Sequence, residues 1–360
     1  MVAQILAIAL KIVVVAFVFS VLILVHEFGH FVAAKRMRVK VEKFSLGFGP
    51  EIVGITRRET RYSISIIPFG GYIKMAGEDP REGLSGKPWE YLSQPVSRRM
   101  AIVCSGPISN YILSFLLFFS VLIVGSPTLT SKVGGCLPDF PAEAHGLMEG
   151  DRIVAIDGEE VKYWDQMAEI IHKRVKGDLV LEVSRDGEIF QVVITPKVDE
   201  MPDIWGKKVK VALIGITPSD EVVKLSYNPW KAFYKAGERT LTLTVITYKG
   251  IWWLISGKMP FREAVAGPIG IASIIGKVAS LGIAPILQLM AILGIALAIF
   301  NLLPFPILDG GNVLFLALEK VRGRPLSPKV QENIQQVALI FIIILILFVS
   351  YNDIVRMTAQ

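Results

Sequence analysis

Two histidines and a glutamate near the start of the chain have the spacing of a metal site. His26 and His30 are four residues apart, and Glu27 follows the first of them. On a helix, residues four apart lie one above the other, so both imidazoles can bind one Zn²⁺. Glu27 then points beside the metal, where it can take a proton from a water held there. The pattern predicts a zinc site with Glu27 as general base.

The segment that carries this motif argues against a chance match. Ile5 to Val25 forms an apolar stretch with a single charge, Lys11. As a helix it is about 31 Å long, enough to cross the hydrocarbon core of a bilayer. The motif at its end therefore lies at membrane depth. Ionisable residues are costly there and usually mark a functional site.

Asp309 is the candidate for a third ligand. It is the only acid between Glu263 and Glu319, and it follows a helix interrupted by Pro304 and Pro306. A catalytic zinc usually has three protein ligands and one open position. Irregular backbone at membrane depth is tolerated only where it is buried in protein or lines a wet cavity. We therefore expect Asp309 to bind the metal, although Asp-Gly-Gly is also an ordinary turn after a helix.

The composition indicates which elements position these residues. Hydrophobic residues make up 52% of the 360, charged residues only 19%, and the mean hydropathy is +0.52. These values exclude a disordered or disulfide-scaffold protein. The charge of +6 comes without basic runs interleaved with aromatics, so no nucleic acid is expected as a partner. The apolar residues are concentrated in four predicted transmembrane helices: Ile5–Val25, Met100–Val124, Ile283–Phe300 and Val337–Tyr351.

Basic residues predict which way these helices point. The loop from Phe31 to Arg99 holds 13 Lys and Arg, and the stretch from Glu319 to Lys329 holds four. Cytoplasmic loops carry such an excess. The prediction is a multi-pass protein in the lipid bilayer with the metal site near the cytoplasmic side. Both termini and the long segment between the second and third spans would then be extracytoplasmic.

Three motifs taken together resemble a known family. His26-Glu27-Phe28-Gly29-His30, Gly106-Pro107-Ile108-Ser109-Asn110 and the stretch from Asn301 to Gly310 are similar to the membrane motifs of site-2 proteases, which are intramembrane zinc metalloproteases. With a domain between spans two and three, the chain resembles the bacterial regulator of sigma-E protease type. The resemblance implies a bacterial inner-membrane enzyme that holds one Zn²⁺ through His26, His30 and Asp309, with Glu27 as catalytic base. It implies cleavage of a transmembrane substrate helix, from an anti-sigma factor or a signal-peptide remnant.

The resemblance also implies roles for two asparagines. Asn301 would be catalytic and Asn110 substrate-binding, as polar groups that face the substrate or the transition state. An amide donor suits the negative charge that builds on the carbonyl oxygen during hydrolysis. Asn301 can equally cap its helix before the Pro-rich break. Asn110 can equally satisfy backbone groups freed by Pro107.

A predicted β-hairpin offers a way to bind an extended substrate. Arg61–Ile67 and Tyr72–Met75 alternate as two strands around Pro68–Gly71. The resemblance implies a membrane-associated β-hairpin here, preceded by Gly47 and Gly49. We expect substrate to add as a strand at Ile64 and Ile66, which with the two glycines complete the substrate-binding set. The alternative is a hairpin that only packs against helices.

The segment between spans two and three is similar to a PDZ domain. Gly146 to Val161 carries the similarity, Trp164–Lys173 predicts a helix, and Val180–Ser184 with Phe190–Pro196 predicts a hairpin joined by Asp186-Gly187. PDZ domains bind chain ends by strand addition. This domain would bind a substrate C-terminus or exclude bulky substrates by size.

The expected fold class is a polytopic α-helical membrane protein with four transmembrane helices, a membrane-associated β-hairpin and an inserted extracytoplasmic PDZ (α+β) domain. A non-catalytic, metal-binding PDZ scaffold is the alternative function, and Glu27 argues against it because a scaffold needs the ligands but not the base. Trp230, Trp252 and Trp253 suit a membrane interface, and the alternative is that they fill a soluble core. The expected order is helix 1 (1–35), hairpin region (36–98), helix 2 (99–125), PDZ domain (126–220), amphipathic interfacial helices (221–282), helix 3 with Asp309 (283–318) and helix 4 (330–355).

Overall fold

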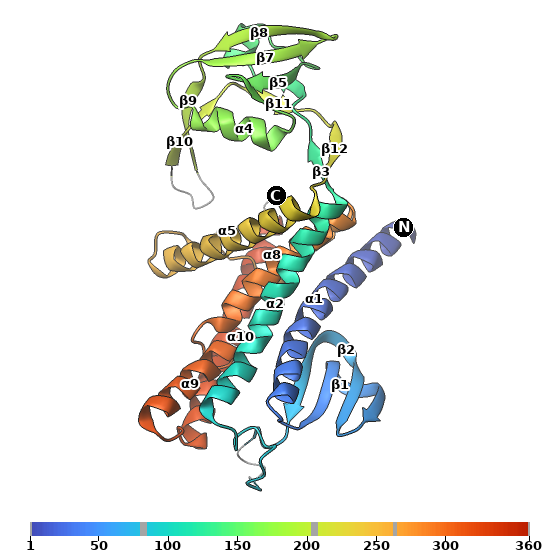
Figure 1. Cartoon of the computed structure of the whole chain (residues 1–360), viewed down its shortest axis with the longest axis vertical. Helices are drawn as coiled ribbons and strands as arrows, with labels where there is room; N and C mark the ends of the chain where they lie inside the picture. The colour runs from blue at the N-terminus through green and yellow to red at the C-terminus, as the bar shows by residue number, and fades with distance from the viewer. Residues whose placement is uncertain (1, 80–84, 203–207, 262–264, 359–360) are drawn as a thin grey trace. The chain divides into compact units, whose positions relative to one another are not determined.

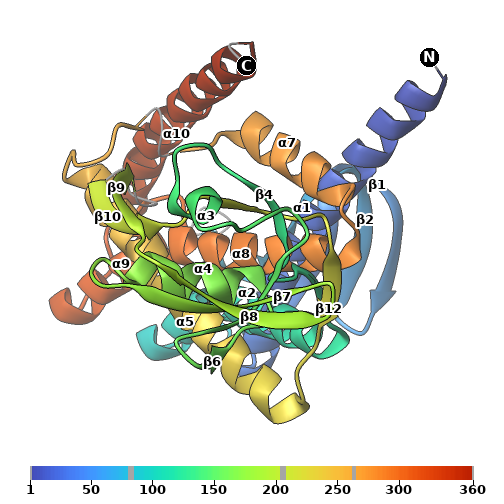
Figure 2. The same ribbon diagram turned by 90° about the horizontal axis from the view of Figure 1, so that it is seen from above.

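The computed structural model describes residues 2–79, 85–202, 208–261 and 265–358. The chain divides into two compact units. Unit 1 consists of Met1–Val121 and Pro229–Gln360, and unit 2 is Leu122–Asn228. Figures 1 and 2 show the elements of both units.

Four helices of the described chain are long and apolar enough to cross a membrane, which confirms the predicted number. They are α1 (Val2–Arg36), α2 (Val96–Val124), α8 (Ile283–Leu302) and α10 (Pro328–Thr358). Helix α10 is longer than the predicted apolar stretch because polar turns extend it at both ends. Ile340, Ile344 and Leu347 on α10 are exposed, at 60%, 60% and 65%. Such a surface is suited to contact lipid rather than water.

The Pro-rich segment turns the chain so that Asp309 begins a new helix. Helix α8 ends at Leu302, Leu303 is extended before Pro304, and α9 runs from Asp309 to Arg322. The turn requires glycine: a Cβ on Gly310 would lie 2.1 Å from the Leu303 oxygen, and one on Gly311 would lie 2.2 Å from the Phe305 oxygen. Asp309 is thereby fixed at the first position of α9.

Two further helices among the described residues belong to unit 1. Helix α7 (Pro268–Ala279) contacts α1, α8 and α10. Its first turn is capped by Asp353 of α10, whose carboxylate accepts from Gly267 N–H at 3.1 Å and Gly270 N–H at 2.7 Å. Helix α5 (Pro229–Ile255) buries Ala232 and Ala236. Its Trp230 side chain is 85% exposed. Its place at a membrane interface stays a prediction.

The hairpin differs from the predicted one in its turn. Strand β1 runs from Val41 to Arg57 and β2 from Thr60 to Met75, so the chain reverses at Arg58 and Glu59 and continues as strand through 68–71. The two strands curl, because Leu46 pairs with both Ile64 and Gly71, and Ile64 also pairs with Val53. Glycines at positive φ permit the bends. Segment 71–75 pairs on one side, with 41–46, and is an edge of the described sheet.

Unit 2 is built from short strands around its own core. Strands β5 (Arg152–Ile156), β6 (Glu159–Glu160), β7 (Leu179–Arg185) and β8 (Glu188–Ile194) form an antiparallel sheet in the order β6-β5-β7-β8. Helix α4 (Trp164–Lys173) contributes Met167 and Ile171 to the core that includes Ile153 and Leu181. The other elements are β3 (Ser126–Leu129), β4 (Val133–Cys136), α3 (Pro141–Ala144), β9 (Lys197–Pro202), β10 (Lys208–Leu213), β11 (Ile216–Pro218) and β12 (Val222–Leu225).

The predicted helix and hairpin of this unit are confirmed. Helix α4 has the predicted bounds, and β7 and β8 meet at Asp186 and Gly187. Both turn residues have positive φ, 53° and 91°, as a two-residue hairpin loop with the favoured twist requires. Strand β12 pairs with β3, so the unit continues past the predicted boundary at 220 to Asn228.

Candidate active site

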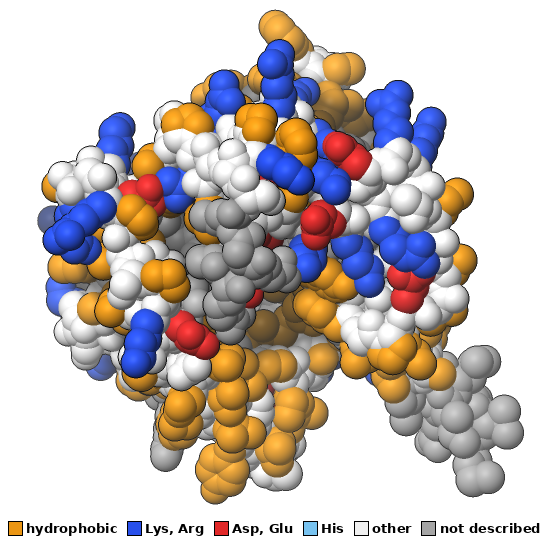
Figure 3. All heavy atoms as spheres, turned by 90° about the horizontal axis from the view of Figure 1, so that it is seen from below, with side chains coloured by type: hydrophobic (Ala, Val, Ile, Leu, Met, Phe, Trp, Pro, Cys, Tyr) orange, Lys and Arg blue, Asp and Glu red, His pale blue; other side chains and the backbone are white. Residues whose placement is uncertain are grey.

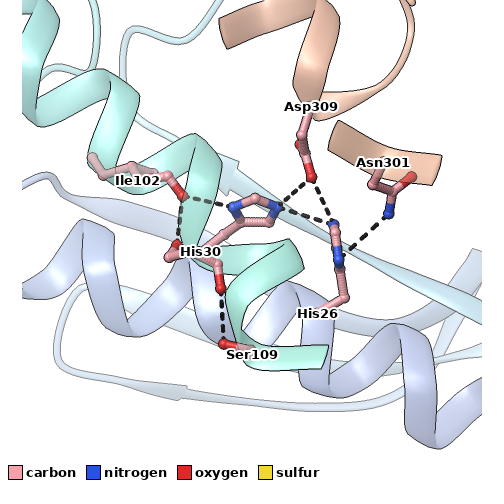
Figure 4. A network of polar contacts seen from close by, with 7 residues as sticks. His26, His30, Ile102, Ser109, Asn301 and Asp309 are labelled. Carbon is pink, nitrogen blue, oxygen red and sulfur yellow. Dashed lines mark hydrogen bonds and ion pairs between the residues drawn. The ribbon is translucent and has the colours of Figure 1, made fainter. Parts of the chain in front are cut away.

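Helix α1 presents His26 and His30 on one buried face. Their exposed fractions are 7% and 8%, and their ring planes are nearly perpendicular. His30 Nδ1 lies 2.8 Å from the Ile102 carbonyl oxygen, to which it donates. That hydrogen bond fixes the tautomer and leaves the Nε2 lone pair directed at His26 and Asp309. Figure 4 shows both rings converging below Asp309.

Two glycines allow α2 to approach these histidines. A Cβ on Gly106 would lie 2.4 Å from His30 Nε2 and 2.8 Å from His26 Cε1. A Cβ on Gly29 would lie 2.3 Å from Ser109 Oγ and 2.4 Å from the Ser105 oxygen. Neither role was predicted from the sequence. The signal available was the presence of each glycine inside a motif that already indicated the site.

The three predicted ligands come together. His26 Nε2 and His30 Nε2 are 3.2 Å apart, and Asp309 Oδ2 lies 3.0 Å from the first and 3.5 Å from the second. Ligand atoms on a tetrahedron with metal bonds of about 2.0–2.1 Å lie about 3.3 Å from one another. These three residues form the candidate metal site found among the described residues. The spacing fits one zinc ion with a fourth position open.

Asp309 gives an independent test of that fit. Its Oδ2 atom is inaccessible to solvent, and no hydrogen bond satisfies it among the described residues. A buried carboxylate oxygen left in this state is costly. A divalent cation between Oδ2 and the two imidazole nitrogens removes the cost, so the donor set suits Zn²⁺.

Glu27 and Asn301 flank the three ligands. Glu27 lies against the end of β2: a Cβ on Gly71 would be 3.7 Å from Glu27 Cγ, and the Ile73 N–H is directed towards its carboxylate. The Asn301 amide nitrogen is 3.5 Å from His26 Nδ1. His26 needs its Nε2 lone pair for the metal, so its Nδ1 carries the proton and is a donor. The suitable partner for this donor is the Asn301 amide oxygen, which faces His26 when the amide oxygen and nitrogen are exchanged. The amide nitrogen then points away from His26 and is available as a donor.

A cavity of about 1230 Å³ extends from the metal site. Its lining includes the apolar side chains of Ile23 and Leu297. The charged and amide side chains that also line it, called the polar end below, are Lys74, Glu78, Asp79, Arg99, Glu319, Gln331, Glu332, Gln335 and Gln336. Arg99 and Glu319 form a two-pronged ion pair in this wall, with 7% and 15% of their side chains exposed. Limited solvation raises the pKa of the Glu78 carboxyl, against the opposing effect of the Met75 N–H. The cavity can admit water to the site.

The remaining predicted residues lie apart from the cavity lining. Asn110 is fully buried in α2, and neither atom of its amide has a partner among the described residues. Ile64 and Ile66 have exposed side chains, but Ile64 is paired with strand segments on both sides. Gly47 and Gly49 shape the bend of β1 with φ of 87° and 85°. Substrate binding by these residues stays a prediction, and the sheet edge beside Glu27 is segment 71–75.

The fold provides helices long enough to span a membrane. Two histidines, an aspartate and a nearby glutamate converge at the end of one of them. This combination defines a membrane-embedded zinc metallopeptidase. The chain belongs to peptidase family M50, whose model matches residues 14–345. This confirms the resemblance to site-2 proteases and the assignment as a zinc metalloprotease.

Curated relatives agree with this assignment. A protein of Agrobacterium fabrum named "Putative zinc metalloprotease" is 34% identical over 353 residues, covering 94% of this chain and 93% of its own. Relatives with the same description from Campylobacter jejuni and Clostridium acetobutylicum are 31% and 32% identical, covering 95% and 96% of this chain and 93% and 97% of their own.

Two solved structures match a smaller part of the chain. The PDZ domain of an SdrC-like protein from Listeria monocytogenes is 29% identical, with a TM-score of 0.20, and covers 25% of this chain and 86% of its own. The solution structure of GtR34C from Geobacillus thermodenitrificans is 27% identical, with a TM-score of 0.18, and covers 21% of this chain and 83% of its own. The PDZ assignment stays a prediction.

Proposed function

We propose that this zinc metalloprotease cuts single-span membrane proteins within the bilayer, as in regulated intramembrane proteolysis of an anti-sigma factor or removal of signal-peptide remnants. The observation that supports it most is the placement of His26, His30 and Asp309 at the end of a candidate transmembrane helix. A peptidase that acts on soluble chains has no need for ligands at this depth.

The residues around the site suit peptide hydrolysis with one Zn²⁺ per chain. Bound there, zinc polarises the substrate carbonyl and lowers the pKa of a water towards about 7. The Glu27 carboxylate takes the proton from the attacking water and passes it to the nitrogen of the departing amine. The Asn301 amide nitrogen donates to the carbonyl oxygen as negative charge builds on it. The cavity walls and the close approach of Gly71 to Glu27 Cγ hold Glu27 in place.

A transmembrane helix hides its peptide bonds in its own hydrogen bonding, so the substrate must become extended before it is cut. Segment 71–75 supports binding by strand addition, because its edge faces Glu27 through the Ile73 N–H. A Cβ on Gly71 would lie 2.7 Å from the Ser45 oxygen, so this position of the edge has no room for a side chain. Ile64 and Ile66 would contact the lipid or substrate from the hairpin surface, and Gly47 and Gly49 would set its curl. Asn110 would offer its unpartnered amide to substrate backbone.

The distribution of charge supports a site near the cytoplasmic side. The end of unit 1 that carries the β2–α2 connection and α9 displays many Lys and Arg side chains (Figure 3). In a bacterial inner membrane this end would be cytoplasmic, and both termini and unit 2 would be extracytoplasmic. Unit 2 would then meet the outer part of a substrate, either by binding its trimmed C-terminus or by excluding untrimmed substrate.

The deciding experiment compares wild type with Glu27→Gln on a tethered single-span substrate in proteoliposomes. We expect Glu27→Gln to keep its zinc, measured by elemental analysis, and to lose at least about a thousandfold in cleavage rate. His26→Ala should lose both zinc and cleavage. Equal cleavage by wild type and Glu27→Gln would contradict the enzyme and favour the metal-binding PDZ scaffold.

A second experiment addresses unit 2. Deleting Lys132 to Lys197 should release cleavage of untrimmed substrate if the unit excludes by size. The same deletion should abolish cleavage of trimmed substrate if the unit docks a chain end. The zinc content of the deletion variant shows whether unit 1 remains folded.

A further inference from the structure

Two carboxylates occupy the edge of β2 that faces the metal site. In an extended strand successive N–H groups point to opposite sides, so those of Ile73 and Met75 point the same way. The N–H of Ala76 donates to the Lys40 oxygen on the β1 side, which places the other two on the outer edge. The Ile73 N–H is directed towards Glu27, and Met75 N–H donates to Glu78 Oε2 at 3.1 Å.

Glu78 is therefore placed like Glu27 but two residues further along the edge. That separation is about 7 Å in an extended strand. Its side chain is exposed inside the cavity, at the polar end. Within the described part of the chain, no Lys or Arg forms an ion pair with Glu78, and its one hydrogen bond comes from Met75.

Acidic side chains outnumber basic ones among the charged residues of the polar end. The described residues of the polar end include the carboxylates Glu78, Asp79, Glu319 and Glu332 against two cations, Lys74 and Arg99. Arg99 is bound by Glu319, and Lys74 lies 3.8 Å from Glu42. A cation brought to Glu78 by a ligand would meet a favourable field.

From these observations we propose that Glu78 is a specificity-determining residue, which selects substrates carrying Lys or Arg about two residues from the cut bond, towards the polar end of the cavity. This inference rests on the proposed cleavage of membrane-spanning substrates.

The selection works by exchange of hydrogen-bond partners. When a substrate strand adds to segment 71–75, a substrate carbonyl takes over the Met75 N–H, and Glu78 loses its one hydrogen bond. A Lys or Arg at this position replaces it with an ion pair. A substrate Gln at this position is a weaker partner for Glu78 than Lys or Arg. A substrate Glu is repelled by Glu78, and this repulsion against the wrong substrate contributes to specificity.

The substrate chemistry agrees with this arrangement. Membrane-spanning segments carry Lys and Arg at their cytoplasmic ends. A substrate drawn into the cavity therefore brings a cation within a few residues of its apolar core.

The test uses full-length enzyme in proteoliposomes and a single-span substrate whose cut bond is located by mass spectrometry. Substrates with Lys, Gln or Glu two residues from that bond, on the polar-end side, are compared by kcat/KM. Wild type should prefer Lys over Glu about tenfold. Glu78→Gln, which can still accept from Met75 N–H, should bring the ratio near one. Glu78→Lys should reverse the preference.

Glu332→Gln is the matched control, because it removes an acid from the same cavity away from the edge, and it should keep the wild-type ratio. An unchanged ratio in Glu78→Gln, or an equal loss in Glu332→Gln, overturns the proposal. Binding of the uncut substrates to Glu27→Gln and to Glu27→Gln/Glu78→Gln should show the same ratios without turnover. If no substrate is cleaved more by wild type than by Glu27→Gln, the proposed function fails; if cleavage requires Glu27 but ignores Glu78, only this inference fails.

Discussion

Gly106 of α2 lies directly against the His30 imidazole. A Cβ at this position would be 2.4 Å from His30 Nε2, the atom that faces Asp309. The same helix accepts the His30 Nδ1–H at the Ile102 carbonyl. Helix α2 therefore sets the position of His30 by both a hydrogen bond and a close contact, without supplying a ligand.

Gly106→Ala should displace His30 and disrupt metal binding. A methyl group cannot fit at 2.4 Å, so the ring or the helix must move. We expect zinc content to fall severalfold and cleavage to fall about a hundredfold or more, since small misplacements in a site have large effects on rate. Gly237→Ala is the control, because its Cβ would find only Phe115 at 4.0 Å, and it should keep both properties. Full zinc content in Gly106→Ala would contradict this account.

The Arg99–Glu319 pair should contribute strongly to the stability of unit 1. Both side chains are largely buried, so Arg99→Met leaves an unpaired carboxylate in the cavity wall. Breaking such a pair costs about 3–5 kcal/mol, whereas replacing both partners with apolar residues is often neutral. Thermal unfolding in detergent should show a lowered Tm for Arg99→Met and substantial recovery in Arg99→Met/Glu319→Leu. Equal destabilisation by the single and double variants would count against a pairwise interaction.

Asp353 should hold the first turn of α7 against α10. Its carboxylate accepts from Gly267 and Gly270, and it is 3% exposed. Asp353→Ala leaves two N–H groups without their acceptor and should cost about 1–2 kcal/mol. Hydrogen exchange of the Gly270 and Ile271 amides should quicken most in Asp353→Ala and less in Asp353→Asn, which keeps one of the two acceptor oxygens. Unchanged exchange in Asp353→Ala would show that the cap is dispensable.

Unit 2 should lose stability in acid through Asp151. Burial raises the pKa of this carboxyl, but hydrogen bonds from Arg185 and from Met148 N–H outweigh it, and the pKa in the folded state lies below the ordinary value. The unfolded value is about 3.9. The stabilisation is therefore fully present above that pH and is lost as the pH falls through the folded-state pKa.

This acid dependence can be measured in the full chain by hydrogen exchange of the Ile153 and Leu181 amides between pH 6 and pH 2. Arg185→Gln should lower the local free energy of unfolding near neutral pH and flatten its fall in acid. Lys173→Gln removes an exposed partner of Glu169 and serves as the control. A wild-type slope in Arg185→Gln would assign the acid dependence to another group.

The identity of the metal ligands was predictable from the sequence, since each carries a local signal. His26 and His30 share a helix face by spacing alone, and Asp309 is a lone acid after a helix break. The four spans were predictable because a bilayer demands long apolar helices. In unit 2, the hairpin at Asp186-Gly187 was predictable because that turn needs two residues with positive φ.

Other features depend on contacts between residues distant in sequence. Periodicity does not specify strand register when one strand pairs with two partners. The sequence therefore predicted strand addition at Ile64 and Ile66, whereas segment 71–75 is the edge of the described sheet. The contact of Gly106 with His30 and the capping of Met75 by Glu78 likewise require the folded chain. The sequence by itself predicted a zinc site, its three ligands and a base, because those are properties of residue type and local spacing. Only the tertiary structure decided which backbone edge faces them and which carboxylate lies at its end, because strand pairing is set by packing across the fold.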